Sequence, residues 1–377
     1  MAEMKKSSYM TPPLATGDAG RVLIFVPKLT LEGGVANYYR MIKDFLPDNY
    51  CFFEKSQAKT LPGKLLATIY DLLRYVLLLT FKDFQLVCFN PSMQPMAVKR
   101  EAVYIFITKK VFRKKLVIFW HGWQESYASE IEKHHLAWFR KRYFAAEKML
   151  VLISGVCDKL RSWGYQGEIK QVITCFEESF AGLTVQPAPQ APFKILFLAR
   201  VELGKGVITA LQALKILRSK CSVPVKMTVA GNGSALAEAE KFARENGLED
   251  VEFPGYIRGK AKIDCLLAND IFLQPSLSEG LPCAMLEAMA CGLAVVTSKV
   301  GGIPDFFAEG VMGFMVDSQD PAVYAEKLAD LINDPVRLKQ CGEYNCMYAR
   351  KKFCASAAAK LECKEITAVM NAGLEKQ

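Results

Sequence analysis

The sequence predicts an α/β protein made of two doubly wound domains, each a parallel sheet with helices on both faces. Short runs of β-branched and aromatic residues alternate with longer helical patterns along the chain. This alternation is typical of parallel sheets covered by helices. The chain also has 377 residues, more than a single hydrophobic core usually serves, so we expect two domains.

Ten runs are expected to be strands, and a Pro-rich segment, VQPAPQAP at 185–192, separates them into two sets, as a linker would. The strand runs are residues 22–26, 86–89, 115–120 and 149–154, then 194–199, 225–231, 251–255, 271–275, 294–298 and 314–317. We therefore expect a disordered tail at 1–20, an N-terminal domain at 21–184, the linker at 185–192, a C-terminal domain at 193–344, and helices at 345–377 that can cross back to the first domain.

The composition favours a folded protein of the cytoplasm. Hydrophobic residues make up 51% and charged residues 23% of the chain, which is ordinary globular usage. Twelve scattered cysteines without a CxxC pair predict reduced thiols, and no apolar run follows the N-terminal lysines, so we expect no secretory signal. Residues 65–81 are the most lipophilic, but Asp71 and Arg74 interrupt them, which favours a buried or interfacial helix over a transmembrane one.

The positive charge lies in the first half. Residues 1–190 hold 26 Lys and Arg against 17 Asp and Glu, whereas residues 191–377 hold 22 of each. Clusters at 109–115 and 140–142 suit an anionic membrane surface, so we expect a peripheral association with the inner face of a membrane; a solvated charge run is the alternative. No DNA-binding or base-stacking pattern accompanies the charge, so no nucleic acid is expected as a partner.

The segment SLSEGLPCAMLEAMACGLAVV holds the candidate site. From Cys283 to Cys291 every residue except Glu287 is apolar, so a buried helix is expected, with Pro282 in its first turn and Gly292 as its C-terminal cap. A lone carboxylate there is costly without a partner. We therefore expect Glu287 to face a polar ligand, with a structural ion pair as the alternative.

Glu279 lies in the loop before that helix and is followed by Gly280 and Leu281. A carboxylate beside two backbone amides offers both an acceptor and donors to one small polar molecule, as sugar hydroxyls require. A plain capping carboxylate is the alternative, since the segment from Ser276 to Glu279 also fits a capping box.

Glu279 and Glu287, with seven residues between them within PSLSEGLPCAMLEAMACGLAVV, resemble the hallmark of family 4 retaining glycosyltransferases of the GT-B fold, the glycosyl transferases group 1. LARVELGKGV, with Arg200 and Lys205, resembles the diphosphate-binding segment of that family. AGNGS at 230–234, FPGYI at 253–257 and VGGIPD at 300–305 are also similar to its motifs.

The resemblance implies a role for each matched residue. Glu279 with the amides of Gly280 and Leu281 would hold the donor sugar, and Glu287 would take the ribose hydroxyls. The remaining matched residues are Ile257, which would meet the base, and Arg200 with Lys205, which would neutralise the leaving diphosphate.

Three residues of the first half complete the candidate site. Gly33 and Gly34 stand between a strand and a helix, where backbone amides can approach a phosphate or sugar, although a simple tight turn explains them equally well. His121, in FWHGW, resembles the active-site histidine of the family. Two positions depart from the family pattern: 172–180 reads VITCFEESF where relatives have an Asn-Gly pair, and Asp305 stands where glutamate is commoner.

The expected reaction is transfer of a sugar, with retention of configuration, from a UDP- or GDP-sugar to a saccharide or lipid-linked saccharide, as in surface polysaccharide or glycolipid biosynthesis. No metal-ligand cluster is evident, so no metal or other cofactor is expected. A nucleotide-sugar epimerase on the same fold and a non-catalytic scaffold remain as alternatives. A dinucleotide-dependent oxidoreductase is disfavoured because the GxGxxG pattern is missing.

Overall fold

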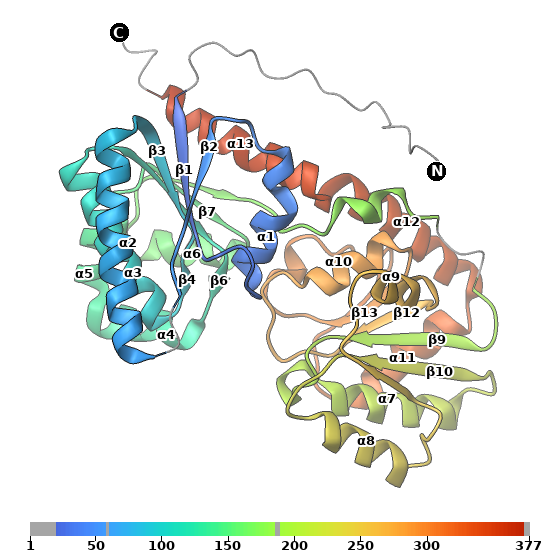
Figure 1. The fold of residues 1–377 in the computed structure, drawn as a ribbon. Helices are drawn as coiled ribbons and strands as arrows, with labels where there is room; N and C mark the ends of the chain where they lie inside the picture. Colours follow the sequence, from blue (N-terminus) through green and yellow to red (C-terminus); the bar gives the residue numbers. More distant parts are fainter. Residues whose placement is uncertain (1–19, 58–59, 185–188, 373–377) are drawn as a thin grey trace, which may run out of the picture.

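The computed structural model describes residues 20–57, 60–184 and 189–372, which form two lobes, each built on a six-stranded parallel sheet (Figure 1). The first sheet has the strand order β2-β1-β3-β5-β7-β8. Its strands are β1 Arg21–Val26, β2 Tyr50–Glu54, β3 Phe84–Phe89, β5 Lys115–Trp120, β7 Lys148–Val151 and β8 Glu168–Gln171, with a separate small pair of β4 Ser92–Met93 and β6 Gly122–Trp123.

The second sheet has the order β11-β10-β9-β12-β13-β14, and every pair in it is parallel. Counted within the lobe, this is the 3-2-1-4-5-6 order of a Rossmann sheet. The predicted fold class, two doubly wound parallel-sheet domains, is confirmed. The strands are β9 Phe193–Leu198, β10 Val225–Ala230, β11 Glu252–Gly255, β12 Ile271–Gln274, β13 Ala294–Ser298 and β14 Gly313–Val316.

Helices cover both faces of each sheet (Figure 1). In the first lobe they are α1 Gly34–Ile42, α2 Leu61–Phe81, α3 Pro95–Phe106, α4 Glu125–Glu130, α5 Leu136–Tyr143 and α6 Ser154–Ser162, with shorter turns η1 Lys43–Phe45, η2 Ile107–Val111, η3 Ile131–His135 and η4 Glu178–Gly182. In the rest of the chain they are α7 Val207–Lys220, α8 Leu236–Glu245, α9 Lys260–Leu267, α10 Cys283–Ala290, α11 Pro321–Ile332, α12 Pro335–Phe353 and α13 Ala355–Asn371, with turns η5 Leu203–Lys205 and η6 Ile303–Asp305.

Two strands of the first sheet were absent from the expectation. Strands β2 and β8 are the two edges of that sheet. An edge strand pairs on one side only and tolerates charge, and β8, with the sequence EIKQ, has three exposed residues among its four. Strand β8 therefore lacks the continuous apolar run by which the central strands were recognised, whereas β2, with the sequence YCFFE, has a short apolar run that was missed.

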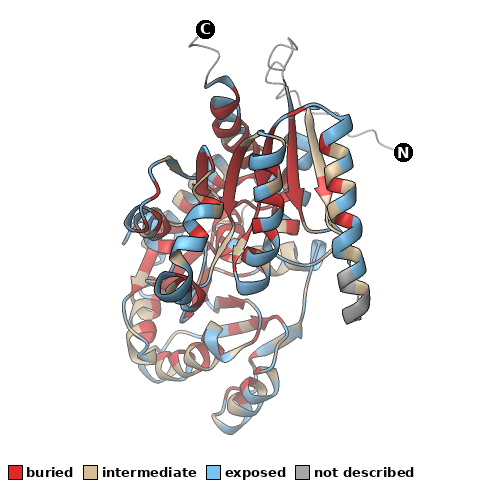
Figure 2. Cartoon of the chain, turned by 90° about the vertical axis from the view of Figure 1, so that its left-hand side faces the viewer, coloured by how far each residue is buried: buried red, intermediate tan, exposed pale blue. Residues whose placement is uncertain are grey.

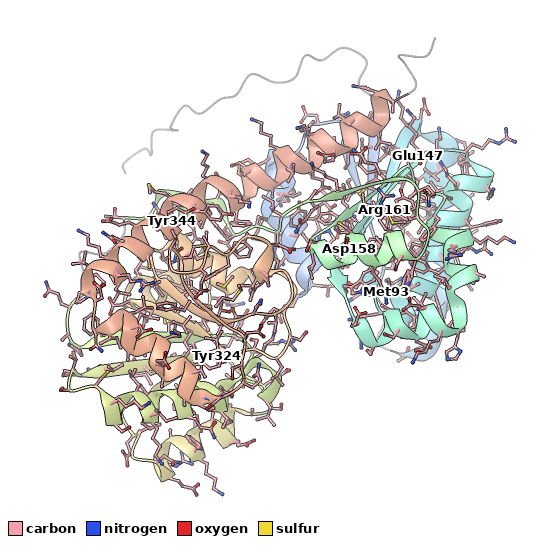
Figure 3. All side chains as sticks on the ribbon, turned by 180° about the vertical axis from the view of Figure 1, so that it is seen from behind. Met93, Glu147, Asp158, Arg161, Tyr324 and Tyr344 are labelled. Atoms are coloured by element: carbon pink, nitrogen blue, oxygen red, sulfur yellow. The ribbon has the colours of Figure 1, made fainter. Side chains whose placement is uncertain are left out.

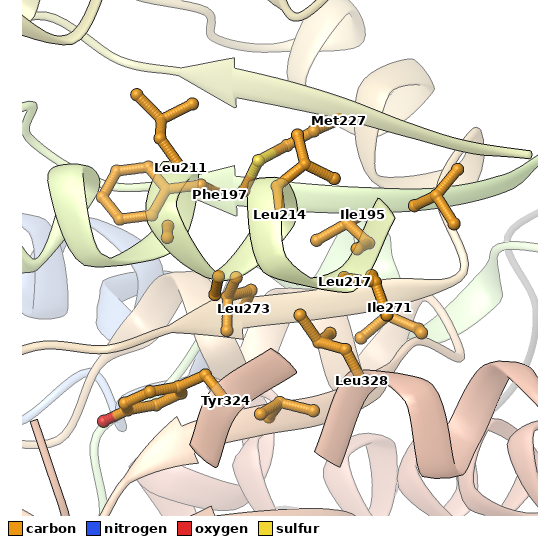
Figure 4. Close-up of a cluster of buried hydrophobic side chains, with 14 of the residues drawn as sticks. Ile195, Phe197, Leu211, Leu214, Leu217, Met227, Ile271, Leu273, Tyr324 and Leu328 are labelled. Atoms are coloured by element: carbon orange, nitrogen blue, oxygen red, sulfur yellow. The ribbon is translucent and has the colours of Figure 1, made fainter. Parts of the chain in front are cut away.

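The core of the second lobe lies between its sheet and the helices α7 and α11 (Figure 4). Ile195 and Phe197 of β9 meet Leu211 and Leu214 of α7, and all four side chains are fully buried. Burying a side chain of this size contributes about 1.5–3 kcal/mol. This packing gives the loops at the carboxyl ends of the strands a rigid base.

The C-terminal helices connect the lobes, with α12, which carries Tyr344, on one lobe and α13 running to the other (Figure 3). Asn345 ties α12 to the second sheet by donating to the carbonyls of Leu293 and Met312, both at 2.8 Å. Helix α13 packs on α1 and β5 of the first lobe. Glu178 accepts from the backbone N–H of Ser356 at 2.9 Å and so caps α13 at its start.

Helix α2 places an apolar face outward, as the exposed residues along it show (Figure 2). Asp71 turns inward and accepts from the backbone N–H and the hydroxyl of Ser56, both at 2.7 Å. Arg74 lies over the ring of Phe53 at 4.3 Å. The two charges that interrupt this segment therefore serve the protein side of the helix. Within the described residues, no helix is long and apolar enough to span a bilayer.

The expected tail at 1–20, apart from Gly20, lies outside the described residues, as do positions 185–188 of the expected linker and positions 373–377 at the C-terminus. All twelve cysteines are free thiols. Helix α12 begins at Pro335, within the range expected for the C-terminal domain, and continues past residue 345.

Candidate functional site

The carboxyl ends of the two sheets face each other. Asp305, in the turn after β13, accepts from Ser154 at the start of α6, from the backbone N–H at 2.7 Å and from the hydroxyl at 2.5 Å. Gln171 donates to the same carboxylate at 2.7 Å. Asp305 therefore acts as a cap on α6 across the two lobes. A cavity of about 210 Å³ lies beside it, lined by Leu281 and Gly302 among others.

A close approach of two loops places Lys205 beside Glu279. Gly206 has φ +78°, and a Cβ there would lie 2.0 Å from the carbonyl oxygen of Pro275, so glycine is required for η5 to pack on the end of β12. The Lys205 Nζ then lies 2.8 Å from Glu279 Oε1 and 3.4 Å from the Ser278 carbonyl oxygen.

The carboxylate of Glu279 is held through one oxygen only. Gln274, at the end of β12, donates to Oε1 at 2.7 Å, the same oxygen that Lys205 contacts. No partner of Oε2 is found among the described residues, although the side chain is only 7% exposed. The capping alternative thus finds no support in these contacts, and Oε2 keeps its lone pairs for a ligand.

Gly301 and Gly302 support the loop that carries Glu279 and Gly280. Gly301 has φ +60°, and a Cβ at this position would lie 2.0 Å from the carbonyl oxygen of Glu279. The Gly302 N–H donates to the Gly280 carbonyl at 2.8 Å. Gly280 is exposed and Leu281 is half-buried toward the cavity between the lobes. The segment VGGIPD therefore works as a support for the Glu279 loop.

Glu287 points from the buried helix α10 toward α9, where Lys262 is its partner. The Lys262 Nζ lies 2.6 Å from Glu287 Oε1, and the Lys262 side chain is 21% exposed. Burial raises the pKa of the Glu287 carboxyl, and Lys262 opposes that shift. The ion pair, which the sequence left as an alternative, is present, while Oε2 again has no partner among the described residues.

Arg200 stands apart from this pair of carboxylates. Its side chain is 71% exposed, and its guanidinium contacts Glu202 at 3.0 Å, not Glu279 or Lys205. The loop AGNGS lies behind it, because the Val201 N–H donates to the Asn232 carbonyl at 2.9 Å. The structure thus places Lys205 in contact with Glu279, carries Glu287 on the helix that follows, and leaves Arg200 exposed on the surface.

Ile257 lies in the loop between β11 and α9, and its half-buried side chain packs on the apolar cluster of α10. Gly255 with φ +71° and Gly259 with φ +55° flank it, so the loop makes two sharp turns. This loop leads directly into α9, the helix that carries Lys262.

In the first lobe, Gly33 is the N-cap of α1 and has φ +142°, a conformation that favours glycine. A Cβ at Gly33 or Gly34 would meet no atom within 4 Å, so this turn opens to free space. His121 follows β5, and its Nε2 lies 3.0 Å from Asn90 Oδ1. Burial lowers the pKa of His121 to about 3, which keeps the ring neutral.

The loop at 172–180, where the sequence departs from the family pattern, contacts the C-terminal helices. The Phe176 N–H donates to the Phe353 carbonyl at 3.1 Å. The Thr174 hydroxyl also lies 3.6 Å from Cys283 Sγ at the start of α10. The loop therefore links α10 to the junction of α12 and α13.

Two functional contacts escaped the sequence reasoning. Gln274 ends a run that was recognised as a strand, but its amide gave no sign of facing Glu279. A cationic partner for Glu287 was an open alternative, yet Arg258, Lys260 and Lys262 all lie in one short segment and the sequence does not choose among them. The described residues contain no group of three or more His, Cys, Asp or Glu side chains that could hold a metal ion.

The fold belongs to the GT-B class of glycosyltransferase structures. The HepE protein of Anabaena in complex with UDP matches with a TM-score of 0.71 and 15% identity, over 92% of this chain and 100% of that one. Sucrose-phosphate synthase from Thermosynechococcus elongatus matches with a TM-score of 0.70 and 16% identity, over 94% of this chain and 100% of that one.

The sequence comparison is more specific for the second half. Residues 184–346 match the family Glycosyl transferases group 1, so this part of the chain is a domain of that group. The amylovoran biosynthesis glycosyltransferase AmsK of Erwinia amylovora is 32% identical over 231 residues, which is 59% of this chain and 56% of that protein. The chain thus spans about half the length of the curated relatives it matches.

Proposed function

We propose that this protein is a retaining glycosyltransferase that moves a sugar from a nucleotide sugar to a hydroxyl of a saccharide or lipid-linked saccharide. The observation that carries the proposal is the arrangement at the end of β12. Lys205 and Gln274 hold one oxygen of Glu279 and leave the other open, and Glu287 repeats this pattern on the following helix. Two carboxylates, one on a loop and one on the helix that follows it, each with one oxygen open, suit the hydroxyls of a sugar and a ribose.

The names of similar proteins support the class of donor and product. The HepE structure contains UDP, and AmsK is described as a biosynthetic glycosyltransferase. We propose a UDP- or GDP-sugar as the donor and surface polysaccharide or glycolipid biosynthesis as the pathway. In this assignment Glu279 with the Gly280 and Leu281 amides holds the sugar. The ribose and base fall to Glu287 and to the Ile257 backbone.

In the proposed reaction the acceptor oxygen forms a bond to the anomeric carbon while the bond from that carbon to the diphosphate oxygen breaks. The acceptor proton passes to the departing diphosphate on the same face, which retains the configuration. Lys205 stabilises the charge that develops on the leaving group, and the exposed guanidinium of Arg200 supplies a second cation. The backbone at Gly33 and Gly34 and the neutral ring of His121 complete the first-lobe side.

A screen of nucleotide sugars tests this function. A true donor at a hundredfold excess over its Kd stabilises the folded protein by about 2.7 kcal/mol, so we expect one UDP- or GDP-sugar to raise the Tm by several degrees. With that donor and a saccharide acceptor, NMR of the product should show the anomeric configuration of the donor, and EDTA should leave the rate unchanged. An inverted product would reject retention. Epimerised sugar in the absence of an acceptor would favour the epimerase instead.

We propose further that the outer face of the first lobe rests on an anionic membrane, where a lipid-linked acceptor would lie. Tyr75 of α2 packs on Tyr104 of α3 with ring centroids 5.2 Å apart, so the two helices lie side by side. Their outward apolar residues form what we call the α2–α3 face: Leu66, Ile69, Tyr70, Leu73, Leu77 and Phe81 on α2, and Met96, Val103 and Phe106 on α3.

Basic residues lie beside the α2–α3 face. Arg142 lies over the Phe106 ring at 4.7 Å, and Lys82, Lys99, Lys110 and Arg113 are exposed on or just after the same helices. An apolar stripe with a cationic border suits insertion among acyl chains beneath anionic head groups.

Sedimentation with vesicles of phosphatidylcholine and phosphatidylglycerol tests the membrane proposal. We expect binding at low salt, weaker binding at high salt, and at least about tenfold weaker binding for the double variant Leu73→Gln/Leu77→Gln, since two exposed apolar side chains lose their insertion energy. The matched control is Val336→Gln/Met347→Gln, which changes two similarly exposed apolar residues on α12. The proposal fails if the wild-type protein stays in solution at low salt.

A further inference from the structure

A buried carboxyl group lies behind His121, on the helix that returns from the second lobe. Glu362 of α13 has no exposed surface. Its Oε2 accepts from the Tyr38 hydroxyl at 2.9 Å, and its Oε1 lies 2.8 Å from the Tyr39 hydroxyl. The Tyr39 hydroxyl also lies 2.8 Å from Asn90 Oδ1, which is 3.0 Å from His121 Nε2. One chain of contacts thus runs from Glu362 to His121.

The orientation of the Asn90 amide follows from its other contact. Asn90 Nδ2 donates to the Phe25 carbonyl at 3.2 Å, so Oδ1 must face both the Tyr39 hydroxyl and the His121 ring. An amide oxygen only accepts, so His121 carries its proton on Nε2 and Tyr39 donates to the same oxygen.

The proton count then reaches Glu362. The Tyr39 hydroxyl has one proton to donate, but its oxygen lies 2.8 Å from both Asn90 Oδ1 and Glu362 Oε1. If that proton goes to Asn90, the contact with Glu362 is a hydrogen bond only when the carboxyl group itself carries a proton and donates it to the Tyr39 oxygen. All the contacts are satisfied together by one proton on Glu362.

The surroundings of Glu362 agree with a neutral acid. Burial raises the pKa of Glu362 to about 7, although the bonds from Tyr39 and Tyr38 oppose the shift. No ion pair to Glu362 is found among the described residues. The titratable groups that face it are hydroxyls and thiols, with burial the leading cause of a raised pKa in each: Tyr38 and Tyr39 on α1, Tyr50 on β2, Cys88 on β3, Cys175 after β8 and Cys363 on α13.

We propose that Glu362 is a positioning residue for His121. As a carboxylic acid it donates to Tyr39, Tyr39 donates to Asn90, and Asn90 holds His121 with its proton on Nε2. The Nδ1 of His121 is then an acceptor for a hydroxyl of the saccharide substrate, a step that rests on the proposed function. Nδ1 has no partner among the described residues. The His121 ring packs on the ring of Phe119, and the two centroids are 3.8 Å apart.

This arrangement depends on pH. As the pH rises through about 7, Glu362 loses its proton and Tyr39 turns its own proton to the carboxylate. Asn90 Oδ1 then loses a donor, and the hold on the His121 tautomer weakens. For stability the sign is the same: the folded pKa is raised from 4.5 to about 7, so this contribution is fully present below about pH 4.5 and is lost as the pH rises through 7.

The variant Glu362→Gln tests the inference because an amide keeps one donor for Tyr39 and one acceptor for Tyr38 but does not titrate. We expect kcat/KM within about threefold of wild type at pH 6. The ratio of variant to wild-type kcat/KM should then increase as the pH rises through 7. A buried acid with a merely structural role would leave this ratio flat, and that result would overturn the proposal.

The tautomer of His121 gives a readout that needs no substrate. The chain has three histidines, so ¹⁵N NMR of labelled imidazoles can follow His121 alone. We expect the Nε2–H form at pH 6, a change near pH 7 in the wild type, and no such change in Glu362→Gln. If neither the wild type nor any variant transfers sugar, the proposed function fails. The spectrum still shows whether Glu362 controls the tautomer of His121.

A matched pair of variants covers the case in which Glu362→Gln does not fold. Tyr39→Phe and Tyr38→Phe each remove one buried hydroxyl that contacts Glu362, but only Tyr39 also contacts Asn90. We expect Tyr39→Phe to give a mixture of His121 tautomers and Tyr38→Phe to keep the wild-type spectrum. Identical spectra for the two variants and the wild type would show that no relay connects Glu362 to His121.

Discussion

Replacing Lys205 by methionine is expected to lower kcat about 10³-fold while changing the KM for the donor little. The ammonium lies 2.8 Å from Glu279 and is fixed by the Ser278 carbonyl, so it is already oriented before a ligand binds. A nucleoside diphosphate gains negative charge as it leaves, and a positioned cation stabilises that charge more than it stabilises the bound donor. Steady-state kinetics with a nucleotide sugar measures both constants.

The control for this change is Lys215→Met. Lys215 is exposed on α7, the helix that follows the Lys205 turn, and its ammonium donates to Asn246 Oδ1 at 2.8 Å. We expect wild-type kinetics for the control and a similar Tm for both variants. A kcat for Lys205→Met within a few-fold of wild type would remove Lys205 from the reaction.

Replacing Glu279 by glutamine is expected to lower kcat/KM by about 10²- to 10³-fold, with the fold retained. The glutamine amide has nearly the same shape as the carboxylate. It lacks the negative charge that faces Lys205, and an NH₂ group, which only donates, replaces one of the two acceptor oxygens. The free Oε2, which the proposal assigns to a sugar hydroxyl, is then lost as a charged acceptor, and charge-assisted hydrogen bonds are the stronger kind.

The matching control is Glu245→Gln, an exposed glutamate on α8 whose nearest cation is Lys241 at 3.8 Å. Thermal melts should separate lost activity from lost stability. Full transfer by Glu279→Gln would remove Glu279 from the proposed contact with the sugar.

Much of the arrangement around Glu279 and Glu287 could be predicted from sequence because it is local. The apolar run around Glu287, the glycine that ends the helix and the loop of Glu279 lie within one short segment, and helix α10 at Cys283–Ala290 follows that prediction. Gly292 indeed has φ +84°, as a residue that ends a helix often does. The central strands were recognised for the same reason, since each is a continuous buried run.

The partners of these residues could not be predicted, because they come from distant parts of the chain. Lys262 reaches Glu287 from another helix, and Glu362 reaches Tyr39 from the far end of the sequence. The outward face of α2 was equally hidden, since its inward charges, Asp71 and Arg74, break the apolar run in the sequence but not on the surface.

The sequence by itself determined the two parallel sheets, the buried helix with its single acid, and the loop that carries Glu279. These features follow from hydrophobic periodicity and turn residues, which act over a few positions. Only the tertiary structure decided which oxygen of each carboxylate stays open, that Arg200 lies apart from Lys205, and that a buried acid stands behind His121. Whether such contacts form depends on differences of a few tenths of an ångström in the distance between two groups. Packing, not neighbouring sequence, brings these groups together.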